Sequence, residues 1–102
     1  MGRKGETESL FRQVVRDHPD FLPSRLALGG LLLDRGDAQE ALEHFRAATA
    51  LDPQSPQAWL GMVMATVTLG RRAEARSYAE RGKGVGLTLP PDVARALEGG
   101  PR

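Results

Sequence analysis

The chain has 102 residues, of which 40% are hydrophobic and 26% are charged, and its formal net charge is +1. This is enough for one globular domain, and the charge argues against a dedicated nucleic-acid binder, which usually carries a strong basic excess. Because the chain has no cysteine, disulfides, thiolate metal sites and a cysteine nucleophile are excluded.

The first half of the chain reads as helices separated by turn signals. A helix is expected over residues 6–17, where Leu10, Phe11, Val14 and Val15 are apolar. A second helix is expected over Leu22–Arg35, with Pro23 in its first turn, where a missing N–H costs little. This helix is apolar nearly all round, which indicates burial on more than one side. The contributing leucines are Leu22, Leu26, Leu28, Leu31, Leu32 and Leu33.

The third expected helix runs to about Leu51, and its apolar residues recur at steps of three and four. Asp37 and Glu40 have the spacing of a capping box at its start. Ser55 followed by Pro56 predicts an N-cap and a proline at the first position of a helix over residues 56–69.

The second half ends in two shorter helices. Residues 72–82 form the next expected helix, with Ala75, Tyr78 and Ala79 pointing inward. Pro90, Pro91 and Asp92 then open a short helix to about residue 98, ended by two glycines at 99 and 100. No stretch shows the strict alternation of a strand, so the sequence predicts an all-α fold.

An internal repeat appears when the sequence is shifted by 34 residues. Glycine, proline, alanine and aromatic residues then fall on one another, and such different residue types rarely align by chance. The matched pairs are Phe11 with Phe45, Pro19 with Pro53, Gly36 with Gly70 and Ala41 with Ala75. Each glycine follows a helix, where a left-handed cap is easiest for glycine.

This pattern resembles the tetratricopeptide repeat, a helix–turn–helix of 34 residues with the motif W-x2-L-G-x2-Y, A-x3-F, P. The first complete repeat matches at Leu28, Gly29, Gly36, Ala41, Phe45, Ala48 and Pro53, but has Arg25 for the tryptophan and Leu32 for the tyrosine. The second matches at Trp59, Gly70, Ala75 and Gly82, and departs at Val63, Thr66, Ala79 and Leu87.

The resemblance implies an all-α fold in which antiparallel helix–turn–helix repeats stack as a short right-handed α-solenoid. We expect a single domain over residues 1–102. It comprises a half repeat at 6–21, a repeat at 22–55, a degenerate repeat at 56–89, and a C-terminal capping helix and tail at 90–102. Degeneration is typical of a terminal repeat, because no further repeat packs on it.

In this family the first helix of each repeat lines the concave side, and the resemblance places the partner-binding positions on the helices that start at residues 22 and 56. They fall on Leu26, Gly30, Leu33, Asp34, Gln57, Leu60, Met64 and Val67. Members that grip a C-terminal carboxylate carry lysine and asparagine at such positions, so this row argues against that role. The alternative is that Leu26, Leu33 and Leu60 simply belong to the core.

Other candidate sites have simpler structural explanations. His18 and His44 lack partners at metal-ligand spacing, and we expect His44 to be exposed beside Glu40. The glycine-rich stretch at 82–86 follows a helix and lacks the P-loop spacing, so we expect a connector. The basic residues Arg71, Arg72, Arg76, Arg81 and Lys83 are interspersed with Glu74 and Glu80 and are expected to form a solvated face.

These observations favour a protein-interaction module that is not an enzyme and needs no cofactor or metal. We expect its partner to be another protein or a peptide bound on an apolar concave groove, with neither nucleic acid nor a membrane span involved. No signal peptide or long apolar run is found, so a cytoplasmic location is expected. Two alternatives remain open: a self-assembling scaffold, for instance a homodimer, and a regulatory subunit of a larger enzyme or secretion complex.

Overall fold

The computed structural model describes residues 2–98, and side chains from residue 5 onward. Within this range the chain forms α1 (Gly2–Asp17), α2 (Leu22–Arg35), α3 (Ala38–Leu51), α4 (Pro56–Thr68), α5 (Arg72–Lys83) and α6 (Pro91–Glu98), and no strand. The expected all-α fold is confirmed. The glycines expected to end the last helix, at 99 and 100, lie outside the described residues.

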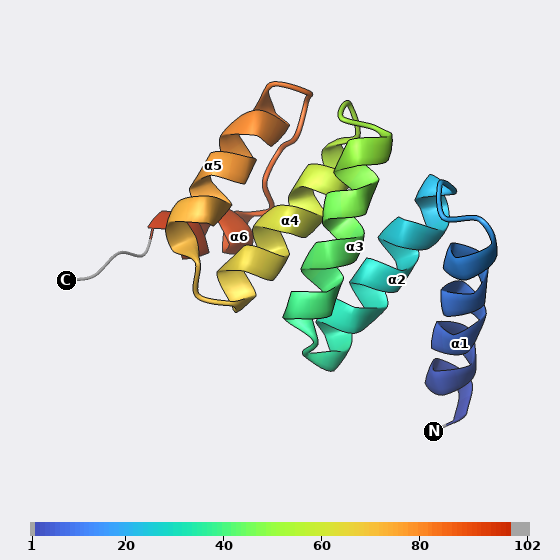
Figure 1. Cartoon of the computed structure of the whole chain (residues 1–102). Helices are drawn as coiled ribbons and strands as arrows, with labels where there is room; N and C mark the ends of the chain where they lie inside the picture. The colour runs from blue at the N-terminus through green and yellow to red at the C-terminus, as the bar shows by residue number, and fades with distance from the viewer. Residues whose placement is uncertain (1, 99–102) are drawn as a thin grey trace.

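Helices α1 to α5 are arranged side by side in chain order, and α6 lies against α4 and α5 (Figure 1). Helix α2 packs against α3, and α4 against α5, as two helical hairpins, while α3 joins the hairpins by packing against α4. Helix α1 packs on α2 at one end, and α6 covers α4 and α5 at the other. The molecule is therefore a short stack of helix–turn–helix units.

The 34-residue period is visible in the backbone hydrogen bonds of the turns. The Gly36 N–H donates to Leu33 O at 3.0 Å and the Asp37 N–H to Leu32 O at 2.8 Å. The equivalent bonds at Gly70 and Arg71 go to Val67 O and Thr66 O at the same two distances. Gly36 and Gly70 have φ of 94° and 78°, as the left-handed caps require.

Both helices start where the sequence predicts, but the predicted side-chain cap is formed only at α4. The Ser55 hydroxyl accepts the Ala58 N–H at 3.2 Å, so Ser55 caps α4 as expected. Asp37 makes no side-chain cap to α3, and the capping box is not formed. Its carboxylate binds Arg35 at 2.7 Å, while Glu40 binds Arg12 of α1.

The centre of the core is the ring of Phe45, which projects from α3 between α2 and α4. Its side chain is buried, with 5% exposure. A Cβ atom built on Gly29 of α2 would lie 2.7 Å from the ring, and a Cβ atom on Gly61 of α4 would also overlap it. The two glycines therefore let two helices approach one aromatic ring from opposite sides.

The helix that closes the stack is held by polar contacts as well as apolar ones. Val93 and Leu97 of α6 are buried against a cluster that includes Ala75 and Ala79. The Arg76 guanidinium donates to Leu97 O at 2.9 and 2.7 Å, and Arg72 donates to Ala96 O at 3.2 Å. Arginines of α5 thus satisfy carbonyls in the last turn of α6, which have no partners within the helix.

Alanine substitutions at two neighbouring glycines of α2 should change the stability of the protein in opposite directions. Gly29→Ala should destabilise the protein by about 1–3 kcal/mol, because the new methyl overlaps a ring that Gly61 confines from the other side. Gly30→Ala should stabilise it by up to about 1 kcal/mol, since alanine favours the helix and its Cβ meets nothing within 4 Å. Urea denaturation measures both, and equal effects would contradict this account of the core.

Candidate functional site

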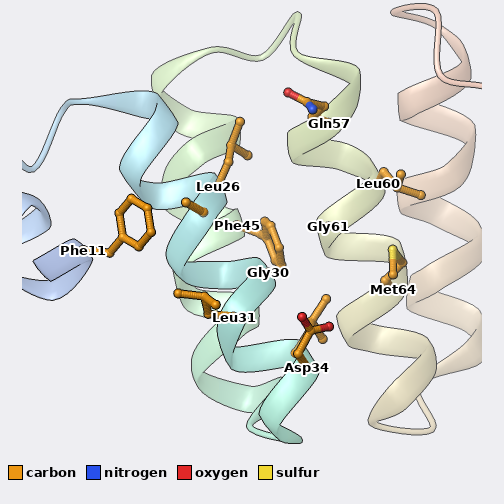
Figure 2. A pocket seen from close by; sticks show the side chains of 12 residues that line it. Phe11, Leu26, Gly30, Leu31, Asp34, Phe45, Gln57, Leu60, Gly61 and Met64 are labelled. Carbon is orange, nitrogen blue, oxygen red and sulfur yellow. The ribbon is translucent and has the colours of Figure 1, made fainter. Parts of the chain in front are cut away.

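A groove of about 500 Å³ lies between α2 and α4 and is bounded on the far side of α2 by Phe11 of α1 (Figure 2). We call it the α2–α4 groove. Its lining residues come from four helices and are Phe11, Leu26, Ala27, Gly30, Leu31, Leu33, Asp34, Phe45, Gln57, Leu60, Gly61 and Met64. The groove is thus lined mainly by apolar side chains, with Gln57 and Asp34 as the polar ones.

The structure brings together all the predicted partner-binding residues except Val67. Leu26, Gly30, Leu33 and Asp34 line the groove from α2, and Gln57, Leu60 and Met64 line it from α4. Val67 lies in an adjacent cavity of about 190 Å³ between α4 and α6, which it shares with Met64. The predicted row therefore continues from one cavity into the next.

Several lining residues were not predicted. Phe11 belongs to α1, and Phe45 reaches the groove from α3, behind the first-helix positions that the family pattern marks. The spacing of 34 residues between the two phenylalanines was a usable signal, because it places both rings at equivalent points. Gly61 carried no such signal, since its role depends on the ring of Phe45 in another helix.

The leucines of the groove are neither fully buried nor free of the core. Leu26, Leu33 and Leu60 are partly buried, and Leu26 and Leu33 pack against the central cluster around Phe45. Met64 is exposed, at 38% of its surface. One side of this row therefore supports the fold while the other faces solvent.

Gly30 leaves open space in the wall of the groove. A Cβ atom built on Gly30 would meet nothing within 4 Å, in contrast to its neighbour Gly29. Glycine in a helix costs about 1 kcal/mol relative to alanine, and no close helix contact requires it here. Figure 2 shows Gly30 on α2, on the side that faces Leu60 and Met64 of α4.

An ion-pair network holds α1 in the position that places Phe11 at the groove. Arg12 donates to both oxygens of Glu40 on α3, at 2.5 and 3.1 Å, and to Glu8 at 2.8 Å. Glu8 in turn accepts from Arg35 of α2 at 2.5 Å. The hydrogen bond from Arg12 is the main cause that lowers the pKa of Glu40 below its usual value.

His44 was expected to be exposed, and this is wrong. It is partly buried, and its Nδ1 lies 3.1 Å from the Arg25 guanidinium while Nε2 lies 3.5 Å from Glu40. Arginine can only donate, so Nδ1 accepts and the ring is neutral with its proton on Nε2. Burial is the main cause that lowers the pKa of His44, and the charge of Arg25 adds to it, while Glu40 acts in the opposite direction.

The basic residues of α5 are exposed and also have partners within the chain. Arg72 and Arg76 bind carbonyls of α6, and the Arg81 guanidinium lies 5.8 Å from the centre of the Trp59 ring. Among the described residues, no group of three or more acidic, histidine or cysteine side chains is placed to hold a metal. No helix in the same range has the length and hydrophobicity to cross a membrane.

Comparison with known protein families identifies the same 34-residue repeat that the sequence pattern indicates. Two family models described as tetratricopeptide repeat match this chain, one over residues 32–86 and the other over residues 1–56. Each match covers more than half of the sequence. The chain belongs to the tetratricopeptide repeat family. Such repeats generally act in protein–protein interactions.

The chain spans less than two thirds of the length of each of three relatives to which it is similar. The chain is similar to the probable biofilm formation methyltransferase WspC of Pseudomonas putida, 43% identical over 80 residues, which are 78% of this chain and 19% of WspC. It is 40% identical over 52 residues to the protein CTR9 homolog of Arabidopsis thaliana, covering 51% of this chain and 5% of the relative. An uncharacterized protein of Methanocaldococcus jannaschii is also 40% identical over 52 residues, 51% of this chain and 60% of that protein.

The neutral state of His44 predicts a pH dependence of stability. The pKa of His44 is lower in the folded chain than its ordinary value of 6.5, so below that pH the unfolded chain binds more protons and stability falls. Glu40, whose folded pKa is also lowered, loses its contribution at more acidic pH, below its ordinary value of 4.5.

His44→Gln should therefore flatten the decline in melting temperature between about pH 7.5 and 5.5. Thermal melts at a series of pH values measure the slope. The control His18→Gln removes the chain's other histidine, which is exposed between α1 and α2, and should keep the wild-type slope. A His44→Gln slope equal to that of the wild type would contradict the assignment.

Proposed function

We propose that this chain binds an apolar segment of another protein in the α2–α4 groove. The observation that carries the proposal is the convergence of the first helices of two successive repeats on one open cavity of about 500 Å³. Residues that are far apart in sequence, such as Leu26 and Leu60, line the same space.

The surface of the groove suits a segment with apolar side chains. The ring of Phe45 forms its floor, and Leu26, Leu60 and Met64 form its walls. The space above Gly30 admits a side chain or backbone of the partner. Methionine is unbranched and polarizable, so Met64 adapts to apolar partners of different shapes.

The same residues disfavour capture of a C-terminal carboxylate. No lysine, arginine or asparagine is among the residues that line the groove. A carboxylate entering it would lose its water without gaining a charged partner, which is costly. The proposed partner is therefore held by apolar contacts, not through a terminal carboxylate.

Filling the notch at Gly30 tests the proposal. A random peptide display library is selected on immobilised wild-type protein and on Gly30→Leu. The wild type should enrich peptides with apolar residues, and Gly30→Leu should lose that enrichment, because the leucine occupies the space above α2. Thermal melting should show that Gly30→Leu is at least as stable as the wild type.

Gly30→Ala is the matched control. It raises helix propensity but adds a single methyl group, so it should retain most of the enrichment. Enrichment that survives Gly30→Leu would place the binding surface elsewhere on the molecule and overturn the proposal. Loss of the folded state in Gly30→Leu would contradict the open space around this glycine.

The similarity to WspC favours a second candidate, in which this chain regulates an enzyme as part of a larger assembly. WspC is named as a methyltransferase, and 80 residues of it align with 78% of this chain. A methyltransferase that copurifies with the native protein, and whose binding Gly30→Leu abolishes, would unite this candidate with the groove.

Self-association through α1 is a third arrangement, suggested by Leu10, which is 65% exposed. Covering this leucine with a second copy of the chain would remove apolar surface from water, which is favourable. If α1 pairs with a second copy, light scattering at high micromolar concentration should exceed the monomer mass of 11.0 kDa, and Leu10→Gln should restore that mass. A wild-type mass of 11.0 kDa at this concentration would rule the arrangement out.

A further inference from the structure

Asp34 is the only charged residue among those that line the α2–α4 groove. It also lines a neighbouring cavity of about 320 Å³, together with Glu8, Leu31 and Arg35. Its side chain is exposed and, within the part of the chain that the structure describes, makes neither an ion pair nor a hydrogen bond. Figure 2 shows its carboxylate at one end of the groove and Gln57 near the other.

The guanidinium of Arg35, next to Asp34 in the sequence, already has two other carboxylate partners. Arg35 donates to Asp37 at 2.7 Å and to Glu8 at 2.5 Å. The other guanidinium in this network, that of Arg12, is bound to Glu8 and Glu40. Four carboxylates, those of Glu8, Asp34, Asp37 and Glu40, thus stand beside two guanidiniums, and Asp34 is the one left without a partner.

The position of Asp34 brings no benefit to α2. It lies in the last turn of this helix, next to Arg35, where the helix dipole is negative and a carboxylate is unfavourable. An acidic residue there would normally be offset by a nearby base. The fold does not explain this residue, whereas a bound cation would.

We propose that the segment bound in the groove carries one cationic side chain, a lysine or an arginine, that pairs with Asp34 while its apolar residues contact Leu60 and Met64. This inference rests on the proposed binding function of the groove. Charge complementarity selects the partner, because Asp34 and the negative end of α2 give this end of the groove a single sign. The charges are reversed relative to family members that bind a carboxylate of the partner with lysine, because here the carboxylate belongs to the chain and the cation to the partner.

Peptide display tests the inference directly. The same random library is selected on the wild type, on Asp34→Asn and on Glu43→Gln. Wild type should enrich peptides in which one lysine or arginine accompanies apolar residues. Asp34→Asn should enrich the apolar residues without the cation. Glu43→Gln removes an equal charge from an exposed position on α3 that is outside the groove, and should select the same peptides as the wild type.

One enriched peptide, made with a fluorescein label, then gives the strength of the pairing. Replacing its lysine with glutamine should weaken binding to the wild type by about two- to fivefold, as for an exposed ion pair. The same replacement should change nothing for Asp34→Asn. The wild-type preference should shrink as salt is raised, and Asp34→Asn should melt at the same temperature as the wild type or higher.

The two proposals fail in different ways. If the wild type enriches apolar peptides without a cation, and Gly30→Leu abolishes that enrichment, the groove function stands and the pairing with Asp34 is overturned. A cation preference lost equally in Glu43→Gln also overturns it, because net charge then explains the effect. If no peptide is enriched, or Gly30→Leu has no effect, the groove function fails and this inference fails with it.

Discussion

The contact on which this structure depends is the insertion of one aromatic ring between two glycines. Phe45 projects from α3, and its ring occupies the space that Cβ atoms on Gly29 and Gly61 would need. This fixes how closely α2 and α4 approach α3. Because α2 and α4 provide most of the groove, with Phe45 as its floor, the same contact that closes the core also determines the width of the proposed binding surface.

Departures from the family motif become intelligible when the contacts are compared between repeats. Arg25 stands where the next repeat has Trp59, yet both donate the same hydrogen bond. Arg25 Nε reaches Pro19 O at 3.1 Å, and Trp59 Nε1 reaches Pro53 O at 2.8 Å. What the repeat needs at this position is a long side chain with an N–H group, and two residue types provide it.

A similar exchange of residue types occurs at two core positions of each repeat, one on its first helix and one on its second. In the first complete repeat a glycine on the first helix, Gly29, faces a large residue on the second, Phe45. Thirty-four residues later the sizes are reversed, with Val63 on the first helix and Ala79 on the second, both buried in one cluster. Leu97 of α6 joins this cluster, so the missing ring is replaced by the final helix. Close packing constrains the combined volume of the pair more than either residue alone.

Sequence reasoning succeeded where a feature depends on neighbouring residues. The bounds of α2, the cap at Ser55 and the left-handed Gly36 all follow from local chemistry, and the family resemblance implied most of the residues that line the groove. It failed where a side chain has partners on another helix. Glu40 binds Arg12, 28 residues away, instead of capping α3, and His44 is covered because it accepts from Arg25, 19 residues away. Such pairings depend on how the helices stack, which no local spacing encodes.

Helix α2 combines strong packing with two locally unfavourable residues. Its buried face is fixed by Leu28, Gly29 and Leu32 against α3 and α4, so its stability comes from tertiary contacts more than from helix propensity. Because tertiary contacts stabilise α2, its opposite face can contain Gly30 and Asp34, two residues that weaken an isolated helix. Both are at the groove and neither has a contact that the fold requires. Residues that oppose local structure without supporting tertiary structure are concentrated where proteins bind their partners, and this concentration on one face of α2 is the physical argument for the proposed role of the groove.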